Sequence, residues 1–247
     1  ESILLAKEYF DNITIDLIYG SPLLTDEMWK SNVDKAISLN IPHLSCYALT
    51  VEEKTPLHKM IHLNKSPDVD NEKQARQFLL LMQWLKSAGY EHYEVSNFAL
   101  PGYRSRHNSA YWQGKKYLGL GPSAHSYNGR HRMWNIANNN LYIRSLTEGK
   151  IPQEKEELTQ KEQLNEYIMI SLRTMEGLNL QRVQQQWGSN IKNTIEKGAQ
   201  KHTAHNLIRL QNNNLQLTES GMLTFHVGTR RRAASASTTA PTCTPGG

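Results

Sequence analysis

A continuous run of β-branched and leucine side chains, "NITIDLIYG", extends from Asn12 to the glycine at position 20. Such runs are typical of strands that are buried on both faces of a parallel sheet, whereas strands with one solvent-exposed face alternate apolar and polar residues. Two later segments have the same character, "PHLSCYALT" from Pro42 to Thr50 and "EHYEVSNF" at residues 91–98. The pattern therefore predicts three strands of one sheet.

Helical periodicity separates these strands. Thr25 is a good N-terminal cap, and apolar residues then recur at helical spacing, at Trp29, Val33, Ala36 and Ile37. A second amphipathic stretch runs from Asp70 to Ala88 and stops at Gly89, where a left-handed conformation would end a helix. Strand and helix in alternation, with short connections, predict right-handed βαβ units and an α/β fold, either a barrel or a doubly wound sheet. Three strands are too few to close a barrel.

The pattern changes after Pro152. The segment "LTQKEQLNEYIMISLRTMEGL" has a capping box at Thr159 and Glu162, followed by apolar residues on one helical face. Further helices are predicted at residues 180–187 and 190–200. The segment "LIRLQNNNLQLTESGML" then indicates a strand, an Asn-rich turn, a strand and a short helix, which is the hairpin of a winged-helix-like domain.

Composition places the chain among soluble globular proteins. It has 247 residues, of which 38% are apolar, and this is enough to bury a core. No apolar run approaches the length of a membrane span, and the N-terminal "ESILLAKEYF" does not have the pattern of a signal peptide. We therefore expect a cytoplasmic location. Only Cys46 and Cys243 are present, which excludes a disulfide framework or a cysteine-clustered metal site.

The two ends suggest a fragment. The chain opens without Met, and from residue 227 it continues as "VGTRRRAASASTTAPTCTPGG", which cannot bury a core. We expect this last segment to be a disordered or adventitious tail. The sequence thus suggests three parts, at residues 1–150, 151–226 and 227–247.

Residues 93–127 crowd aromatic rings, histidines and cations into a segment that we expect to be irregular. Residues 95–147 contain no Asp or Glu, yet they carry seven cationic side chains: Arg104, Arg106, Lys115, Lys116, Arg130, Arg132 and Arg144. A ligand bound here is expected to be anionic and flat. Nucleic acid is one alternative, because aromatic rings stack on bases and cations pair with phosphates. The weakly basic hairpin around Arg209 argues against it.

Asp16 stands inside the first apolar strand, where an unpaired carboxylate would be costly to bury. It should therefore have a partner. A carboxylate near the carboxyl end of a parallel strand can hold the hydroxyls of a ribose. A structural hydrogen bond to a neighbouring loop is equally compatible with the sequence.

Gly119, Gly121 and Ala124 imitate a dinucleotide-binding fingerprint. Pro122 occupies the turn, however, and no acidic residue follows about 20 positions later, as that fingerprint requires. We interpret the segment instead as a place where the backbone approaches a ligand or another strand closely, with His125 beside it.

His107 precedes Asn108, Tyr111 and Trp112 in "RHNSAYW". A neutral imidazole can bind haem iron, and Arg104 and Arg106 could pair with propionates. A hydrogen-bonded loop histidine is the simpler interpretation, since one histidine does not define a metal site.

Five motifs in order resemble one family. They are "IDLIYG" followed by Pro22, "YALTVEEKTPL", "GYEHYEVSNFA", "SRHNSAYW" and "YLGLGPSAHSY", and the likeness extends from about Asn12 to Phe225. The chain resembles the HemW-type haem chaperones of the oxygen-independent coproporphyrinogen III oxidase-like radical SAM family. The resemblance implies the C-terminal half of a radical SAM (β/α) barrel followed by a mainly helical, winged-helix-like domain.

The resemblance also implies ligands. By position, Asp16, Ile18 and the backbone at Ala48 would belong to the S-adenosylmethionine site. His107 would be the candidate ligand of haem iron, with four neighbours whose roles are inferred from chemistry: Arg104, Arg106, Tyr111 and Trp112. Haem or another porphyrin and a haem-accepting protein would be the partners.

The family's CxxxCxxC motif, which holds a [4Fe-4S] cluster, is missing from this sequence, and Cys46 cannot replace three thiolates. The cluster is therefore expected in a full-length parent only, and the chain alone is expected to be catalytically inert. An oxygen-independent coproporphyrinogen III oxidase, which decarboxylates propionates, is the alternative parent.

Overall fold

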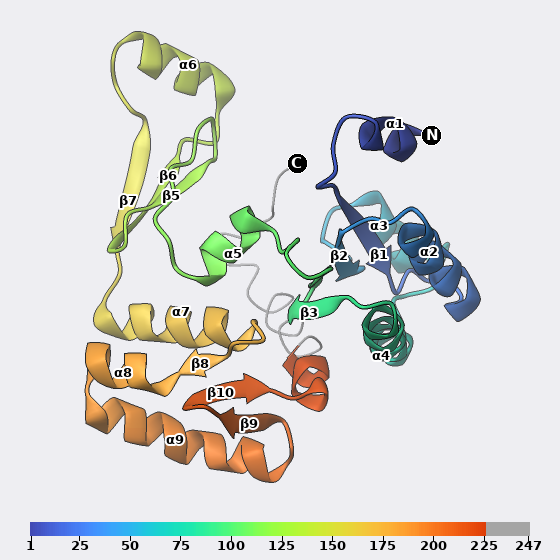
Figure 1. The fold of residues 1–247 in the computed structure, drawn as a ribbon. Helices are drawn as coiled ribbons and strands as arrows, with labels where there is room; N and C mark the ends of the chain where they lie inside the picture. Colours follow the sequence, from blue (N-terminus) through green and yellow to red (C-terminus); the bar gives the residue numbers. More distant parts are fainter. Residues whose placement is uncertain (226–247) are drawn as a thin grey trace. The chain divides into compact units, whose positions relative to one another are not determined.

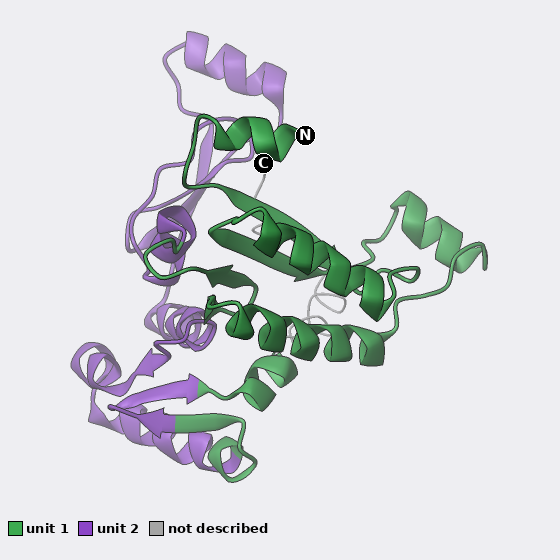
Figure 2. Cartoon of the chain, turned by 45° about the vertical axis from the view of Figure 1, so that its right-hand side comes forward, with its two compact units in different colours: residues 1–104, 202–209, 217–247 green, residues 105–201, 210–216 purple. Residues whose placement is uncertain are grey.

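The computed structural model describes residues 1–225, so the tail expected at 227–247 lies outside the described residues. The chain forms two compact units (Figure 2). Unit 1 comprises residues 1–104 and 202–209 and the chain from residue 217, and unit 2 comprises residues 105–201 and 210–216. The boundaries of these units differ from those of the three parts that the sequence suggested. The division at residues 1–150, 151–226 and 227–247 stays a prediction.

Unit 1 contains a four-stranded sheet of order β1-β2-β4-β3 (Figure 1). Its strands are β1 (Thr14–Tyr19), β2 (His43–Ala48), β3 (Glu91–Glu94) and β4 (Asn97–Ala99). β1 and β2 are parallel, as predicted. β4 is antiparallel to both of its neighbours. The α/β class is confirmed, but the third predicted strand is in fact two.

The Glu94 side chain explains this division. Its Oε2 accepts hydrogen bonds from the Ser96 backbone N–H at 3.0 Å and from Asn97 Nδ2 at 2.5 Å. The carboxylate thus folds the chain back on itself within two residues. Pairing is also irregular between His92 and Glu94, as in a β-bulge. β4 therefore lies between β2 and β3.

Four helices accompany this sheet: α1 (Ser2–Lys7), α2 (Asp26–Ser38), α3 (Pro56–His62) and α4 (Asn71–Ser87). The predicted cap at Thr25 is confirmed, because its side chain accepts from the Met28 N–H. Asp70, where the second amphipathic stretch begins, likewise accepts from the first turn of α4. Gly89 has a φ of +85° after α4. α3 was not predicted; Thr55 caps it and Pro56 fits its first turn.

The core of unit 1 fills the space between the sheet and the two long helices, α2 and α4. The Tyr19 ring stacks on Trp29 of α2 at 5.5 Å and on Phe78 of α4 at 6.3 Å, measured between ring centroids. The core also contains Val33, Leu44, Cys46, Leu81, Leu85 and Phe98. One face of the sheet is thus covered by helices, which leaves the other face for polar side chains.

Unit 2 begins with α5 (Arg106–Trp112), although we expected an irregular segment there. Ser105 caps this helix by accepting a hydrogen bond from the Asn108 N–H at 3.2 Å. An antiparallel sheet of order β5-β6-β7 follows, built from β5 (His125–Tyr127), β6 (His131–Asn135) and β7 (Gln153–Glu157). The helix α6 (Asn139–Thr147) connects β6 to β7.

The three predicted helices are present as α7 (Gln160–Leu172), α8 (Leu180–Trp187) and α9 (Ser189–Ala204), and the predicted hairpin is formed by β9 (Ile208–Gln211) and β10 (Asn214–Leu217). A short strand that was not predicted, β8 (Leu178–Asn179), precedes α8. The capping box of Thr159 and Glu162 is present. The three strands form a sheet of order β8-β10-β9, with Asn212 and Asn213 in the left-handed region at the turn. Residues 219–225 are helical. None of the described helices is long and apolar enough to cross a membrane.

Candidate functional site

The predicted site residues fall into two groups. The first group lies on the open face of the unit 1 sheet, which is the face that α2 and α4 do not cover. Strand alternation puts Asp16 and Ile18 on the face opposite α2 and α4. Asp16 is exposed, and Ile18 is 59% exposed. The expectation of a buried Asp16 was therefore wrong, because β1 alternates in burial although its sequence is almost uniformly apolar.

A hydrogen-bonded chain crosses this face. Thr14 Oγ1 lies 2.7 Å from His43 Nδ1, and His43 Nε2 lies 2.7 Å from the Tyr93 hydroxyl. The Arg104 guanidinium is 5.4 Å from the Tyr93 ring centroid, and its Nε donates to Glu91 at 3.0 Å. Burial lowers the pKa of the His43 imidazole, and the charge of Asp16 opposes this effect only in part. The open face thus carries an imidazole fixed by two hydrogen bonds and, on the neighbouring strand, the exposed carboxylate of Asp16.

The residues at the end of β2 divide between the two faces. Tyr47 pairs in register with Ile18, and its side chain shares the open face. Burial raises the pKa of the Tyr47 hydroxyl, a hydrogen bond with Ser45 offsets part of the rise, and Asp16 adds to it. Ala48 packs in the core instead, so only its backbone can face a ligand. The structure therefore brings together Asp16 and Ile18, with the backbone at Ala48 on the strand beside them.

Buried glutamines of α4 hold the loops that follow β1 and β2, and the sequence analysis missed them. Gln77 Oε1 accepts from the Gly20 N–H at 2.9 Å, and its Nε2 donates to Leu24 O at 3.2 Å. Gln74 Nε2 donates to Leu49 O at 2.9 Å. Polar residues on the apolar stripe of a helix were the available signal, because a buried amide needs partners.

The second group lies on α5 in unit 2. His107 is exposed, and its ring stands edge-on to Tyr111 with 4.9 Å between centroids. Tyr111 in turn lies 4.7 Å from Tyr117. The Arg173 guanidinium lies 4.8 Å from the Trp112 ring centroid. Tyr117 and Arg173 were not predicted as neighbours, and Arg173 lies 61 positions beyond Trp112 in the sequence.

Fewer of the seven cations in residues 95–147 are available to bind an anionic ligand than the sequence suggested. Four of them pair with glutamates outside residues 95–147: Arg104 with Glu91, Arg130 with Glu157, Arg132 with Glu166, and Arg144 with Glu148. Within residues 1–225 no ion pair forms at Arg106, Lys115 or Lys116. Arg104 also belongs to unit 1, whereas Arg106 and His107 belong to unit 2. The structure therefore does not place Arg104 in one unit with the α5 group.

Gly119 confirms the expected close approach of the backbone. A Cβ atom at this position would lie 2.1 Å from the His125 carbonyl oxygen. Asn135 Nδ2 donates to the carbonyl of Gly121 at 2.8 Å, which fixes the same loop. His125 pairs with Trp134 in the β5-β6 ladder, with 6.4 Å between their rings. Gly119 thus serves close packing against β5 in unit 2.

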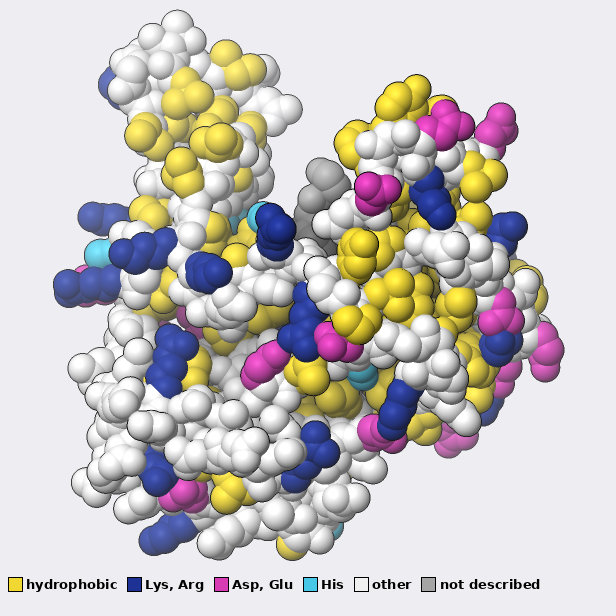
Figure 3. Space-filling view, viewed as in Figure 1, with side chains coloured by type: hydrophobic (Ala, Val, Ile, Leu, Met, Phe, Trp, Pro, Cys, Tyr) yellow, Lys and Arg dark blue, Asp and Glu magenta, His cyan; other side chains and the backbone are white. Residues whose placement is uncertain are grey.

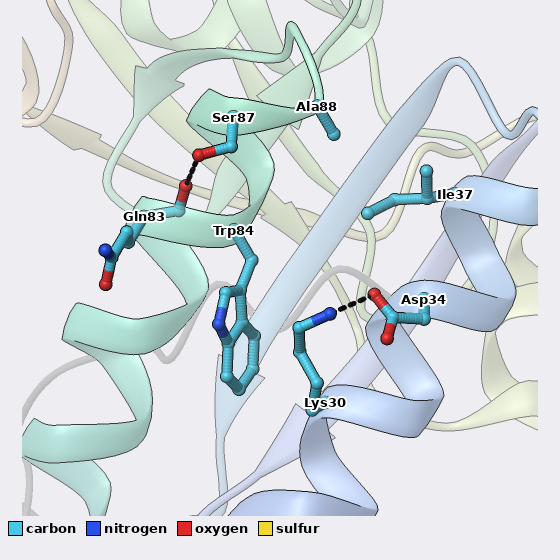
Figure 4. A pocket seen from close by; sticks show the side chains of 7 residues that line it. All are labelled: Lys30, Asp34, Ile37, Gln83, Trp84, Ser87 and Ala88. Carbon is cyan, nitrogen blue, oxygen red and sulfur yellow. Dashed lines mark hydrogen bonds and ion pairs between the residues drawn. The ribbon is translucent and has the colours of Figure 1, made fainter.

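A groove of about 390 Å³ lies between α2 and α4, on the helical side of unit 1 (Figure 4). Trp84 forms one wall, and Lys30 crosses it with its Nζ 5.4 Å from the indole centroid. Lys30 also forms an ion pair with Asp34. The groove contains none of the predicted site residues, and it opens on the face opposite Asp16.

No group of three or more His, Cys, Asp or Glu residues that could hold a metal ion occurs in the described part of the chain.

The sequence of this chain is similar to one protein family and to several known proteins. The family "HemN C-terminal domain" matches residues 158–224. "Heme chaperone HemW" of Lactococcus lactis subsp. lactis (strain IL1403) is 38% identical over 181 residues, which are 72% of this chain and 47% of that protein. The protein of the same name from Bacillus subtilis (strain 168) is 30% identical over 215 residues, covering 87% of this chain and 57% of the relative. The chain spans about half the length of the curated relatives it matches.

A solved structure shares the fold. It is described as "Coproporphyrinogen III oxidase (HemN) from Escherichia coli is a Radical SAM enzyme", and it matches 92% of this chain and 56% of its own length with a TM-score of 0.70. Sequence identity to it is 20%, so this likeness supports the fold alone.

Proposed function

Because the chain belongs to the HemW-type branch of the coproporphyrinogen III oxidase-like radical SAM family, we propose that it is part of a haem chaperone. The observation that carries the proposal is the exposed His107 imidazole on α5, edge-on to Tyr111. The neighbouring Arg106 forms no ion pair with any described residue. A haem bound here would have an iron ligand and a cation for a propionate on one helix.

The chemistry of this group fits haem better than it fits other anions. An imidazole ligates haem iron, and aromatic side chains such as Tyr111 and Trp112 offer apolar area to a flat macrocycle. Arg106 can form charge-assisted hydrogen bonds with a carboxylate. Arg104, which pairs with Glu91, would contribute to propionate binding only if that ion pair exchanged.

We also propose S-adenosylmethionine binding on the open face of the unit 1 sheet. Asp16 supplies an exposed carboxylate for ribose hydroxyls, Ile18 an exposed apolar contact and Ala48 its backbone. The [4Fe-4S] cluster, whose role would be to give an electron to S-adenosylmethionine, needs three cysteines that this sequence does not contain. The full-length parent would hold it.

The oxidase alternative has less support, because the two haem chaperones compared above are 38% and 30% identical to this chain, whereas the solved coproporphyrinogen III oxidase is 20% identical. Nucleic-acid binding also loses support, since four of the seven cations are paired with glutamates. A haem-accepting protein in the cytoplasm would receive the cargo in our proposal.

Titration of the purified chain with haemin tests this function. We expect a shifted Soret band, and His107→Ala should remove the shift and weaken binding about tenfold or more. His62→Ala, which removes an exposed histidine of α3, is the matched control. An unchanged spectrum for His107→Ala would remove His107 from the site. If the bound species were nucleic acid, affinity would instead fall steeply with salt and be indifferent to His107.

A further inference from the structure

An exposed apolar surface surrounds α6 in unit 2, and we call it the α6 patch. Figure 3 shows hydrophobic side chains gathered over α6, with Lys and Arg side chains below them on the same face. Six large apolar side chains are between 45% and 80% exposed: Leu118, Leu120, Leu141, Ile143, Leu146 and Ile151. Monomeric proteins rarely expose so many neighbouring aliphatic side chains unless the surface binds something.

Hydrogen bonds join the segments of the patch into one surface. The Tyr142 hydroxyl of α6 accepts from the Gly121 N–H at 3.1 Å, which attaches the loop of Leu118 and Leu120 to the helix. The Ile136 N–H donates to the Pro152 carbonyl at 2.9 Å, which holds the chain next to Ile151. Since these bonds fix the backbone beneath the side chains, the patch is a built surface.

Cations lie at the base of the patch. Lys116 precedes Leu118 by two residues, so their backbones are within about 7 Å of each other in an extended chain. Lys115 and Lys116 are exposed, and neither forms an ion pair with another described residue. Residues 105–157 contain eight Lys or Arg against four Glu. Because Lys115 and Lys116 are exposed and unpaired among the described residues, the base of the patch carries positive charge.

Three of the four glutamates within residues 105–157 have partners. Glu148 pairs with Arg144 at 3.2 Å and with Lys150 at 3.1 Å. Glu154 accepts a hydrogen bond from Trp134 Nε1 at 3.1 Å, and Glu157 pairs with Arg130. The pairing of these carboxylates reduces the repulsion that they would otherwise exert on an approaching anionic surface.

We propose that the α6 patch binds the surface of an anionic phospholipid bilayer. The aliphatic side chains would enter the boundary between headgroups and acyl chains, and Lys115 and Lys116 would contact lipid phosphates. Nucleic acid offers no apolar layer for six aliphatic side chains. A second copy of the chain, docked by the same patch, would bring the same unpaired lysines toward each other. His107 is not part of this contact, which goes beyond the proposed chaperone function.

Flotation of the chain with lipid vesicles tests the proposal. We expect binding to vesicles of phosphatidylglycerol and phosphatidylcholine in equal parts, little binding to pure phosphatidylcholine, and release by salt. Leu118→Ser/Leu120→Ser should weaken partitioning at least about tenfold, and Lys115→Gln/Lys116→Gln should do so by a similar factor. Circular dichroism should stay unchanged because all four side chains are exposed.

The matched control is Leu23→Ser/Leu63→Ser, which removes two exposed leucines of unit 1. Equal losses in the patch and control variants would overturn the proposal, as would the absence of binding to anionic vesicles. Sedimentation equilibrium measures whether the chain forms a dimer through the same patch. A dimer that the patch substitutions abolish, with no vesicle binding, would assign the surface to a second copy.

Discussion

The Nε2 atom of His43 lies 2.7 Å from the hydroxyl oxygen of Tyr93, and both side chains are almost fully buried. The bond joins the central strand β2 to β3, although these strands are not neighbours in the sheet. His43 Nδ1 is engaged by Thr14 at the same time. The imidazole is therefore fixed from both sides, and it connects three strands of unit 1.

Tyr93→Phe should destabilise unit 1 by about 1–2 kcal/mol, because it leaves a buried ring nitrogen of His43 without its partner. The phenyl ring would keep its packing with Arg104, so the loss isolates the hydroxyl. Urea denaturation followed by circular dichroism measures the change. Tyr9→Phe, at a 73% exposed tyrosine, should change the free energy of unfolding by less than about 0.5 kcal/mol. Equal effects of the two substitutions would show that the hydrogen bond contributes nothing.

Stability should decrease as the pH falls below about 6.5, the ordinary histidine value. Burial lowers the pKa of both His43 and His92 in the folded state, so the unfolded chain binds protons first on acidification. Stability is therefore fully present above the unfolded pKa and is lost as the pH falls toward the folded values.

Urea midpoints between pH 5 and pH 8 measure this slope. His43→Asn and His92→Asn should each flatten it, and His62→Asn at an exposed position is the matched control. A slope that neither variant reduces would exclude both histidines as its source.

Local signals in the sequence were sufficient for much of the fold. Asp70 and Thr159 mark helix starts because their side chains accept hydrogen bonds from the first turn, and this chemistry does not depend on the rest of the protein. The parallel pairing of β1 with β2 followed from two apolar runs around an amphipathic helix. The turn at Glu94 was not predictable, since its cause is a side chain bonding to the backbone two residues away.

The site was less predictable than the fold because its properties depend on distant residues. Whether Asp16 is exposed depends on which face of β1 the helices cover, and the apolar run did not reveal this. The charge of the segment around Arg130 and Arg132 is set by Glu157 and Glu166, which lie 27 and 34 positions away in sequence. Composition in a window cannot detect such pairs. The roles of Asp16, Ile18, Ala48 and His107 stay predictions.

Gln77→Leu should destabilise unit 1 by about 2–4 kcal/mol. The substitution leaves the Gly20 N–H and the Leu24 carbonyl without their buried partner, and leucine has nearly the same volume as glutamine. Gln83→Leu is the matched control on the same helix, because Gln83 is exposed. The free energy of unfolding from urea titration should change far less for Gln83→Leu. A small effect of Gln77→Leu would mean that the loop after β1 is held by other contacts.

Two glycines of unit 2 should respond in opposite directions to alanine. A Cβ at Gly119 would lie 2.1 Å from the backbone oxygen of His125, and a backbone atom cannot rotate away as a side chain can. Gly119→Ala should therefore destabilise the chain by about 2 kcal/mol or more, the cost of forced overpacking. Gly198 lies within α9 with no atom within 4 Å of its Cβ position, so Gly198→Ala should stabilise by about 0.5–1 kcal/mol through helix propensity. Thermal unfolding of both variants gives the comparison, and destabilisation by Gly198→Ala would contradict the open space around that residue.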